Sequence, residues 1–202
     1  EASQVIGKVA MHLKNLDVDM LSFSAHKFYG PKGVGILYKR AKNPHVQIAP
    51  LIVGGGHERG ERSGTVNLPL IVGLTKALEL VSTELATQVE KLQGLQGEFW
   101  TLLQAAFPRA RLNGPAIGAK RACNNLNVTF VGSHIPMSLQ GIAVSRGSAC
   151  HSGKWTPSPV LRALGLSETE AQSTLRISMG LPTTIADIHQ AVSILKKQIT
   201  SN

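Results

Sequence analysis

The sequence predicts an α/β fold, because short apolar runs of strand length alternate with longer segments whose apolar residues recur at helical spacing. The helical segments extend from Leu68 to Val81 and from Ile185 to Leu195. A hydrophobic fraction of 43% is that of a globular protein able to bury a core. The strand-like runs lie at residues 20–24, 34–38, 125–131 and 174–180.

One long helix is predicted in the middle of the chain. Asn67 is a suitable N-cap, and Pro69 suits the first helical turn. We expect the helix to reach Ala106 with a bend near Gly94 or Gly97, because glycine weakens a helix interior. The remaining predictions are a loop at 107–120, a short strand from 142, a short helix at 159–164 continued by 168–173, and a last helix starting near 183–187.

The net charge of +9 raises the question of nucleic-acid binding. The basic residues are scattered, however, and only five Phe, two Trp and two Tyr are available to stack on bases. No apolar run is long enough to span a membrane. We therefore expect no nucleic-acid partner and no membrane partner, and a chain of 202 residues organised as one domain or two small ones.

The chain has two cysteines, Cys123 and Cys150, which is too few for a disulfide framework. This usage fits a reducing compartment and predicts a cytoplasmic location. Cys123 precedes a predicted strand and is expected to be passive. Glu1 is not a start methionine, and no signal-peptide pattern follows it, which suggests a fragment or a processed product.

The segment at residues 21–35 carries the most informative chemistry. An apolar strand-like run ends in Ser24, His26 and Lys27, and a turn rich in Gly and Pro follows. A lysine at the end of a buried strand is costly to keep charged, and a neutral amine can form a Schiff base with a carbonyl cofactor such as pyridoxal phosphate (PLP). Ser24 and His26 can donate hydrogen bonds to a phosphate. Spacing alone favours the plainer alternative of a surface lysine beside a hairpin turn.

A second informative stretch, residues 53–65, is rich in glycine and charge and ends just before the predicted helix. Successive backbone N–H groups in such a loop can cradle an anion. His57 and Glu58 have no further ligand at a usable spacing, so no metal site is predicted. A flexible surface loop is the alternative interpretation.

Cys150 lies in a third stretch, at residues 142–153, where a short apolar run leads into small residues. A thiol on a loop next to His151, and near Arg146 and Lys154, meets the conditions for a reactive thiolate. An ordinary loop cysteine fits the local sequence equally well.

Arg176 lies in the strand-like run at 174–180, between apolar neighbours that would face the other side of a sheet. A guanidinium group can clamp an amino-acid carboxylate through two parallel hydrogen bonds. The alternative is a strand arginine that only faces solvent.

Three stretches of the chain match motifs of one enzyme family in their order. They are Ser-Phe-Ser-Ala-His-Lys-Phe-Tyr-Gly-Pro-Lys-Gly at 22–33, Gly-Gly-Gly-His-Glu-Arg-Gly-Glu-Arg-Ser-Gly-Thr at 54–65, and Arg-Gly-Ser-Ala-Cys-His-Ser at 146–152. They resemble the cysteine desulfurases, a branch of the class V aminotransferase-like PLP enzymes, over the C-terminal half of the family's usual length. The resemblance implies fold type I of the PLP-dependent transferases. Residues 1–90 would form the C-terminal part of the large domain with the start of a linker helix, and residues 91–202 the small α/β domain with the nucleophile loop.

The resemblance also implies roles for residues around the cofactor. Lys27 would bond PLP through a Schiff base, and Ser24 and His26 would hold its phosphate. Gln4 matches a glutamine that reaches the phenolic oxygen of the cofactor. Glu1 occupies the position of an aspartate that pairs with the pyridine nitrogen, although glutamate is one methylene longer. The segment that contains both is expected to be the end of a strand.

Further roles implied by the resemblance involve a second chain and the substrate. Thr65 would contact the phosphate of the partner's cofactor, which makes the protein a homodimer. Cys150 would attack the sulfur of the PLP-bound substrate, and Arg176 would hold the substrate carboxylate. The Cys-His-Ser sequence is also similar to that of the related selenocysteine lyases.

The function implied is a PLP-dependent cysteine desulfurase that converts L-cysteine to L-alanine. The sulfur would pass as a persulfide on Cys150 to an acceptor protein or small thiol, for iron-sulfur cluster assembly or another sulfur compound. One alternative is a selenocysteine lyase. The other is a non-catalytic fragment that acts as a binding or dimerisation module.

Overall fold

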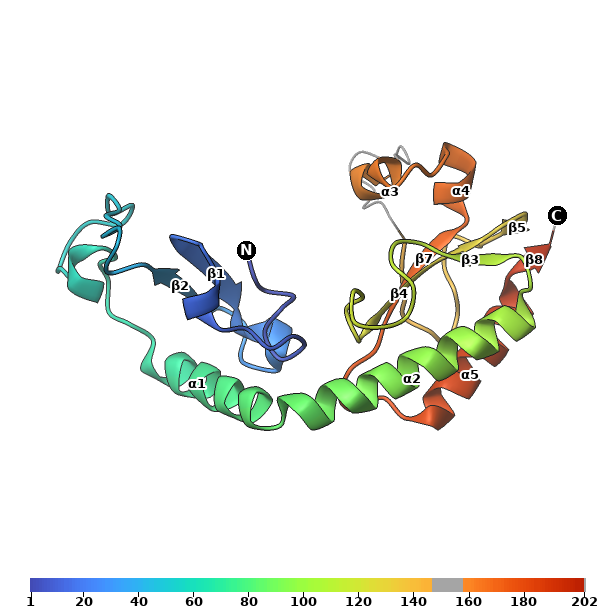
Figure 1. Ribbon diagram of the computed structural model, residues 1–202, viewed down its shortest axis with the longest axis horizontal. Helices are drawn as coiled ribbons and strands as arrows, with labels where there is room; N and C mark the ends of the chain where they lie inside the picture. The colour runs from blue at the N-terminus through green and yellow to red at the C-terminus, as the bar shows by residue number, and fades with distance from the viewer. Residues whose placement is uncertain (147–157, 202) are drawn as a thin grey trace. The chain divides into compact units, whose positions relative to one another are not determined.

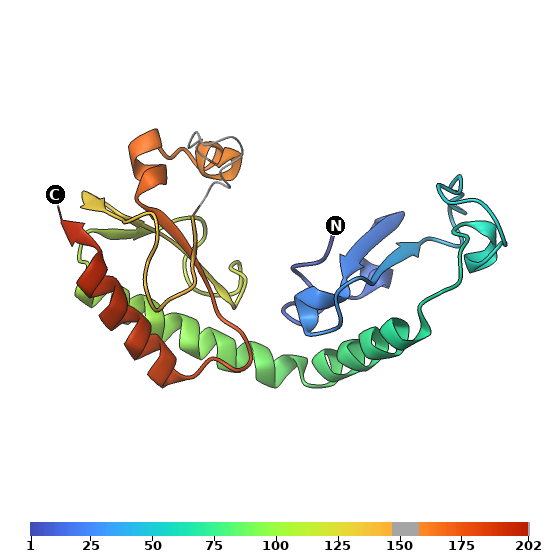
Figure 2. The same cartoon turned by 180° about the vertical axis from the view of Figure 1, so that it is seen from behind.

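A computed structural model describes residues 1–146 and 158–201. The chain divides into two compact units, Glu1–Thr87 and Gln88–Asn202. Figures 1 and 2 show the elements of each unit, which are coloured along the chain from blue to red.

The first unit contains a two-stranded antiparallel sheet. Strand β1, Met20–Ser24, pairs with β2, Gly35–Lys39, and Ser24 lies opposite Gly35. The strand predicted at 20–24 is confirmed, and the second strand begins one residue later than predicted. The cause is a hydrogen bond in which the Ala25 N–H donates to the Val34 carbonyl at 3.1 Å, so that Val34 closes the turn.

Helix α1, Leu68–Thr83, packs against this sheet and begins at the predicted cap. The Asn67 side chain accepts a hydrogen bond from the Leu70 N–H at 3.3 Å, and Pro69 lies in the first turn, where a missing N–H costs nothing. The apolar side of α1 joins the core of the unit. The buried members of that core are Ile6, Ala25, Phe28, Leu74, Ala77 and Val81.

Residues 3–8 form a turn and residues 1–2 pair with no strand, so the prediction of a strand end at Glu1–Gln4 is wrong. The segment is nevertheless tied to β1, because the Ala2 N–H donates to the Ser22 carbonyl at 2.8 Å. Gly7 makes the turn possible. Its φ is +72°, and a Cβ there would lie only 3.1 Å from the Cβ of Val81 on α1.

The prediction of a single long helix that bends at Gly94 or Gly97 is also wrong. Helix α1 ends at Thr83, and a new helix, α2, spans Leu85–Ala106 with both glycines in its interior. The break lies at Glu84, whose φ and ψ of −99° and 10° end α1. Burial of α2 side chains such as Phe99 and Leu103 against the sheet of the second unit outweighs the roughly 1 kcal/mol that a helical glycine costs.

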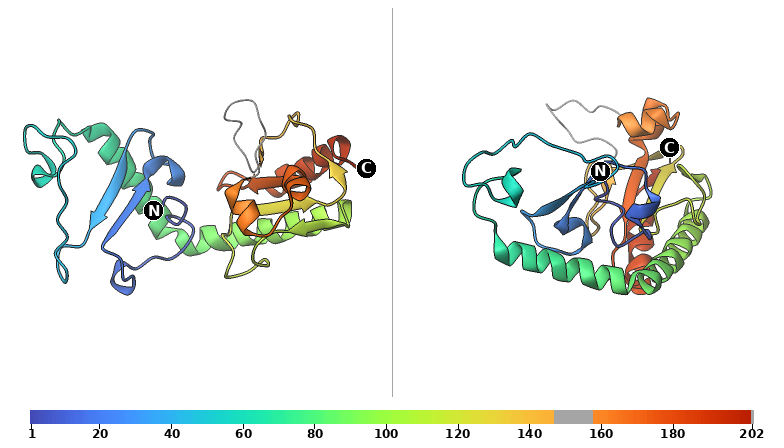
Figure 3. Two further views of the ribbon diagram at one scale, coloured as in Figure 1. Left: turned by 90° about the horizontal axis from the view of Figure 1, so that it is seen from above. Right: turned by 60° about the vertical axis from the view of Figure 1, so that its left-hand side comes forward.

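The second unit is a four-stranded antiparallel sheet covered on one face by helices. The strand order is β3-β4-β7-β6, and α2 and α5 lie on the same face (Figure 3). The core lies between the helices and this face, and contains Leu103, Leu126, Leu175 and Leu195, each fully buried. The bounds are β3 Ala110–Leu112, β4 Asn125–Phe130, β6 Ser145–Arg146, β7 Thr174–Ser178 and α5 Ile185–Gln198.

Small elements complete the description of the chain. In the second unit, strands β5 and β8 form a separate pair, and α3 and α4 bury Leu161, Leu166 and Ala171 together. The bounds of these small elements and of two 3-10 helices in the first unit are η1 Leu13–Asn15, η3 Glu58–Gly60, β5 Ser133–His134, α3 Pro159–Ala163, α4 Glu168–Gln172 and β8 Thr200–Ser201.

Two edges of the large sheet differ from the prediction. The loop predicted at 107–120 contains β3, whose three residues are too few to show alternation in the sequence. The strand predicted from 142 is shorter than expected, because only Ser145 and Arg146 pair with β7.

On β4, Thr129 is buried although it is polar, because its hydroxyl hydrogen-bonds the Thr174 hydroxyl at 2.8 Å.

The N-terminus of α5 predicts a local dependence on pH. The Asp187 carboxylate accepts hydrogen bonds from the Thr184 hydroxyl at 2.7 Å and from the Thr184 N–H at 2.8 Å. These bonds, the hydroxyl first, hold the pKa of Asp187 below its ordinary value. The carboxylate therefore stabilises the fold above the unfolded pKa of about 3.9, and this contribution is lost as the pH falls through the folded pKa.

Replacing Thr184 by valine is expected to raise the pKa of Asp187 towards its ordinary value, because the largest stabilising hydrogen bond is removed. An NMR titration of the side-chain carboxyl carbons measures this change. Glu170 is the internal control, because its pKa is lowered first by the Ser167 N–H and then by Arg111. An Asp187 pKa that did not rise in Thr184→Val would contradict this account of the cap.

Candidate active site

Two buried side chains anchor the turn that carries Lys27 in the core of the first unit. After β1 the chain forms a 3-10 helix, η2, Ala25–Phe28. Residues three apart share a face of a 3-10 helix, and Ala25 and Phe28 are 0% and 1% exposed in the core. His26 and Lys27 lie between them and are exposed. The turn then closes at Gly30, where a Cβ would approach the Ala25 Cβ to 2.9 Å, so only glycine fits.

Lys27 itself is exposed, so the expectation of a lysine at a buried strand end is wrong for this structure. The physical reason is that β1 pairs only with β2, and no described element covers the Lys27 side chain. Among the described residues, no side chain or carbonyl bonds the Lys27 amine, whereas its own backbone carbonyl accepts from the Lys8 ammonium at 3.1 Å. The amine is therefore accessible to a carbonyl compound.

The other predicted cofactor residues of the first unit lie at three places. Ser24 is half-buried at the end of β1, and its N–H donates to the buried Ser3 hydroxyl at 3.2 Å. This contact brings the segment of Glu1 and Gln4, both exposed, to the end of β1 that leads into Lys27. Thr65 is exposed in the loop before α1.

The glycine-rich loop before α1 is organised by a buried serine. Ser63 is 3% exposed, and its hydroxyl accepts from the Gly56 N–H at 3.2 Å. The Ser63 N–H in turn donates to the Ile52 carbonyl at 3.0 Å. An ion pair between Lys39 of β2 and Glu61 ties the loop to the sheet. These contacts fix the loop that ends at Thr65, just before helix α1.

Arg176 lies at the centre of the exposed face of the second sheet. Its neighbours Leu175 and Ile177 are buried, which confirms the predicted alternation along β7. Its strand partners are Asn127 on β4 and Ser145 on β6. The Arg176 Nη2 donates to the Ser145 hydroxyl at 3.1 Å. Ser145 could not be identified from the sequence, because its proximity to Arg176 depends on the pairing of strands far apart in the chain.

Of the two cysteines, only Cys123 lies among the described residues. Cys150, the predicted nucleophile, lies outside the described residues. Cys123 is 2% exposed in the core of the second unit, as expected of a passive residue. Burial of this kind keeps a thiol away from solutes, so Cys123 is unsuited to exchange sulfur.

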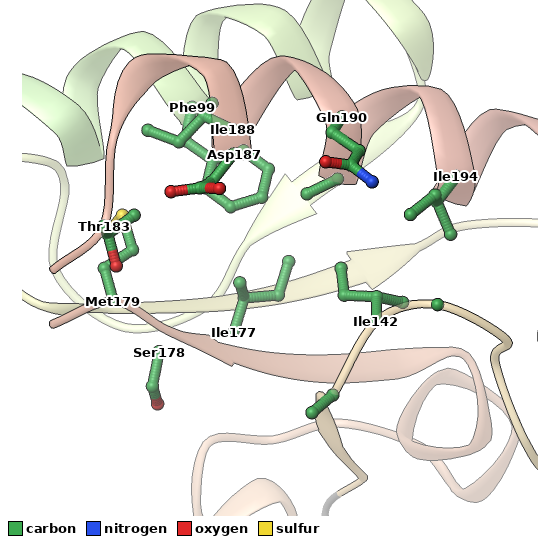
Figure 4. Close-up of a pocket in the computed structure, with 13 residues that line it drawn as sticks. Phe99, Ile142, Ile177, Ser178, Met179, Thr183, Asp187, Ile188, Gln190 and Ile194 are labelled. Atoms are coloured by element: carbon green, nitrogen blue, oxygen red, sulfur yellow. The ribbon is translucent and has the colours of Figure 1, made fainter.

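A cavity of about 270 Å³ lies on the helical side of the second sheet (Figure 4). Its lining is mainly apolar and includes Phe99, Ile142, Ile177, Met179 and Ile188. Ile177 faces the side of the sheet opposite to Arg176, since neighbouring residues on β7 alternate between the two faces. The cavity is therefore not part of the arrangement formed by the predicted site residues.

The donor set of the first unit fits PLP. The turn offers a primary amine on Lys27 for the aldehyde, with the Ser24 hydroxyl and the His26 imidazole as donors for the phosphate. The Lys27 amine is free to react, because none of the described residues bonds it and the contact from Lys8 is made to the Lys27 backbone carbonyl. One primary amine and two further donors are thus present on or beside one turn.

No helix within residues 1–146 and 158–201 combines the length and apolar character needed to cross a membrane. The same residues contain no group of three or more His, Cys, Asp or Glu side chains that could hold a metal ion.

Comparisons with known proteins agree on one family. The family model for aminotransferase class-V matches residues 1–191. Cysteine desulfurase IscS of Escherichia coli O139:H28 is 44% identical over 202 residues, which are 98% of this chain and 49% of that protein. The chain spans about half the length of the curated relatives it matches.

Solved structures agree with this match. A NifS-like protein aligns with a TM-score of 0.81 and 35% identity over 98% of this chain and 50% of that one. A structure of SspA in complex with cysteine aligns with a TM-score of 0.63 and 36% identity over 89% of this chain and 49% of that one. The α/β structure thus matches NifS-like enzymes over half their length.

Proposed function

Because the chain belongs to the aminotransferase class-V family, we propose that it supplies the lysine, nucleophile and substrate-binding arginine of a PLP-dependent cysteine desulfurase. The observation that carries the proposal is the exposed Lys27 amine on a turn with Ser24 and His26. The identity to cysteine desulfurase IscS and the likeness to a structure of SspA with cysteine support the choice of substrate. On this proposal residues 1–90 belong to a large domain and residues 91–202 to a small one.

The roles of the residues follow from their chemistry. Bound PLP supplies an electron sink for charge that develops at the substrate α-carbon. Lys27 would hold the aldehyde through its amine, and its Nζ would accept the α-proton of the substrate. Ser24 and His26 would donate to the phosphate, Gln4 would hydrogen-bond the phenolic oxygen, and Glu1 would pair with the pyridine nitrogen.

Arg176 and Cys150 act on the substrate. The Arg176 guanidinium binds the carboxylate of cysteine and orients its side chain. The Cys150 thiolate attacks the substrate sulfur, a sulfur–sulfur bond forms, and the carbon–sulfur bond breaks. The β-carbon keeps the electron pair of the broken bond and takes up a proton, so the products are alanine and a Cys150 persulfide and no added oxidant is needed. An acceptor protein or a small thiol then collects the sulfur.

The proposal includes a homodimer in which Thr65 contacts the phosphate of the partner's cofactor. The segment before the loop supports it, because Leu51, Ile52 and Val53 are 98%, 50% and 78% exposed. Adjacent exposed apolar side chains favour an interaction surface. Sedimentation equilibrium is expected to show a dimer that Leu51→Asp weakens. A chain that stays monomeric at every concentration would contradict the homodimer.

The experiment for the proposed function follows sulfur on the two cysteines. The purified chain is incubated with PLP and L-cysteine, and the peptides that contain Cys150 and Cys123 are examined by mass spectrometry. We expect one added sulfur on Cys150, lost in Cys150→Ser because a hydroxyl is not a comparable nucleophile towards sulfur. Cys123→Ala is the matched control and should keep the persulfide. A persulfide that survives in Cys150→Ser, or none in the wild-type chain, would contradict the proposal.

A further inference from the structure

The exposed face of the second sheet places a polar residue on each side of Arg176. In the strand register, Arg176 lies opposite Asn127 on β4 and opposite Ser145 on β6. Residues opposite each other on antiparallel strands have Cβ atoms about 4.5–5.5 Å apart. Only the Ser145 side chain is bonded to the guanidinium, at 3.1 Å, among the residues that the structure describes.

The direction of this hydrogen bond leaves both partners with unused donors. A guanidinium group has five N–H donors and no acceptor, so the serine oxygen must be the acceptor. One Arg176 donor is used in this bond, and four remain for a ligand. The Ser145 hydroxyl has accepted a bond and keeps its own O–H to donate. Two side chains therefore present donors side by side on an exposed surface.

Such a pair matches a carboxylate better than an arginine alone. A carboxylate offers about four lone-pair sites on two oxygens, and a guanidinium in a fork uses two of them. A neighbouring hydroxyl can fill a third. Its bond to Nη2 also restricts the rotamers of the long arginine side chain, which lowers the entropy cost of ordering it on binding.

We propose that Ser145 is a substrate-binding residue that donates a hydrogen bond to the amino-acid carboxylate held by Arg176. The inference rests on the proposed function, because the substrate is taken to be an amino acid whose carboxylate Arg176 binds. It deepens that proposal by assigning a role to a residue that neither the sequence motifs nor the chemistry of the turn at Lys27 identified.

The test measures carboxylate binding without catalysis. The full chain, labelled with ¹⁵N-arginine, is titrated with propionate, which has a carboxylate but no amine or thiol to react at Lys27 or Cys150. The Arg176 Nε–H resonance is assigned from its absence in Arg176→Lys. We expect the propionate midpoint to rise at least about tenfold in Ser145→Ala, as loss of one hydrogen bond to a charged group predicts.

Two variants serve as controls. Ser145→Thr keeps the hydroxyl and should bind within about twofold of the wild-type chain. Ser178→Ala removes a hydroxyl from the same strand and face, and none of the described residues bonds that hydroxyl; it should leave the midpoint unchanged. A Ser145→Ala midpoint within twofold of wild type would overturn the inference. An Arg176 resonance that does not respond in the wild-type chain would also overturn it, while PLP bonding at Lys27 remains an independent measurement.

Discussion

Replacing Lys27 by alanine is expected to abolish covalent binding of PLP and formation of the Cys150 persulfide. The lysine amine is the proposed partner of the PLP aldehyde, and loss of its proton-transfer role alone would slow the reaction about 10²–10⁴-fold. The fold should survive, because Lys27 is exposed and the contact it receives from Lys8 is made to its backbone carbonyl. Absorbance of PLP mixed with the chain, together with thermal unfolding, separates the two effects.

Lys32→Ala is the matched control for this experiment. Lys32 is also exposed and lies five residues after Lys27 in the same connection between β1 and β2. Among the described residues, its side chain has no bonded partner. It should keep both the PLP absorbance change and the persulfide. Equal loss in both variants would show that a nonspecific lysine reaction was being measured. An unchanged PLP absorbance in Lys27→Ala would exclude Lys27 as the cofactor lysine.

A large effect is also expected on the stability of the second unit, which carries Arg176. Phe130→Ala is expected to lower the free energy of unfolding of this unit by about 3–5 kcal/mol. Phe130 is 1% exposed, and its ring lies 4.9 Å from the Phe107 ring at an angle of 84°. The truncation removes an aromatic side chain and leaves a cavity in a close-packed core. Since domains are stabilised by about 5–15 kcal/mol, the loss is a large fraction.

Urea unfolding followed by tryptophan fluorescence measures the effect, because Trp100 packs against the core of this unit. Val160→Ala is the control. Val160 is 65% exposed on α3, and its truncation should change the unfolding free energy by about 0.5 kcal/mol or less. If Phe130→Ala and Val160→Ala unfolded at the same urea concentration, the assignment of the core would be wrong.

Elements with a strong local signal could be predicted from the sequence. The cap at Asn67, strand β1, and the outward position of Arg176 depend on contacts within a few residues. Such features follow from backbone hydrogen bonding and from the two-residue period of a strand, which the sequence shows directly. The family, which the family model confirms, could be predicted from the resemblance of three sequence motifs at 22–33, 54–65 and 146–152.

Features that depend on distant contacts could not be predicted. The approach of Ser145 to Arg176 requires strand pairing across 31 residues. Strand β3 is defined by its pairing with β4 rather than by its own pattern. The helix break at Glu84 instead of Gly94 or Gly97 reflects burial of α2 against the second sheet, which overrides local propensity. The exposure of Lys27 likewise depends on which elements cover β1.

The central claim is that Lys27 is the lysine that bonds PLP, and one measurement tests it most directly. The purified wild-type chain is incubated with PLP, reduced with borohydride and digested, and the pyridoxyl adduct is located by mass spectrometry. The account predicts a stoichiometric adduct confined to Lys27. Adducts spread over surface lysines such as Lys32, or no adduct, would contradict it.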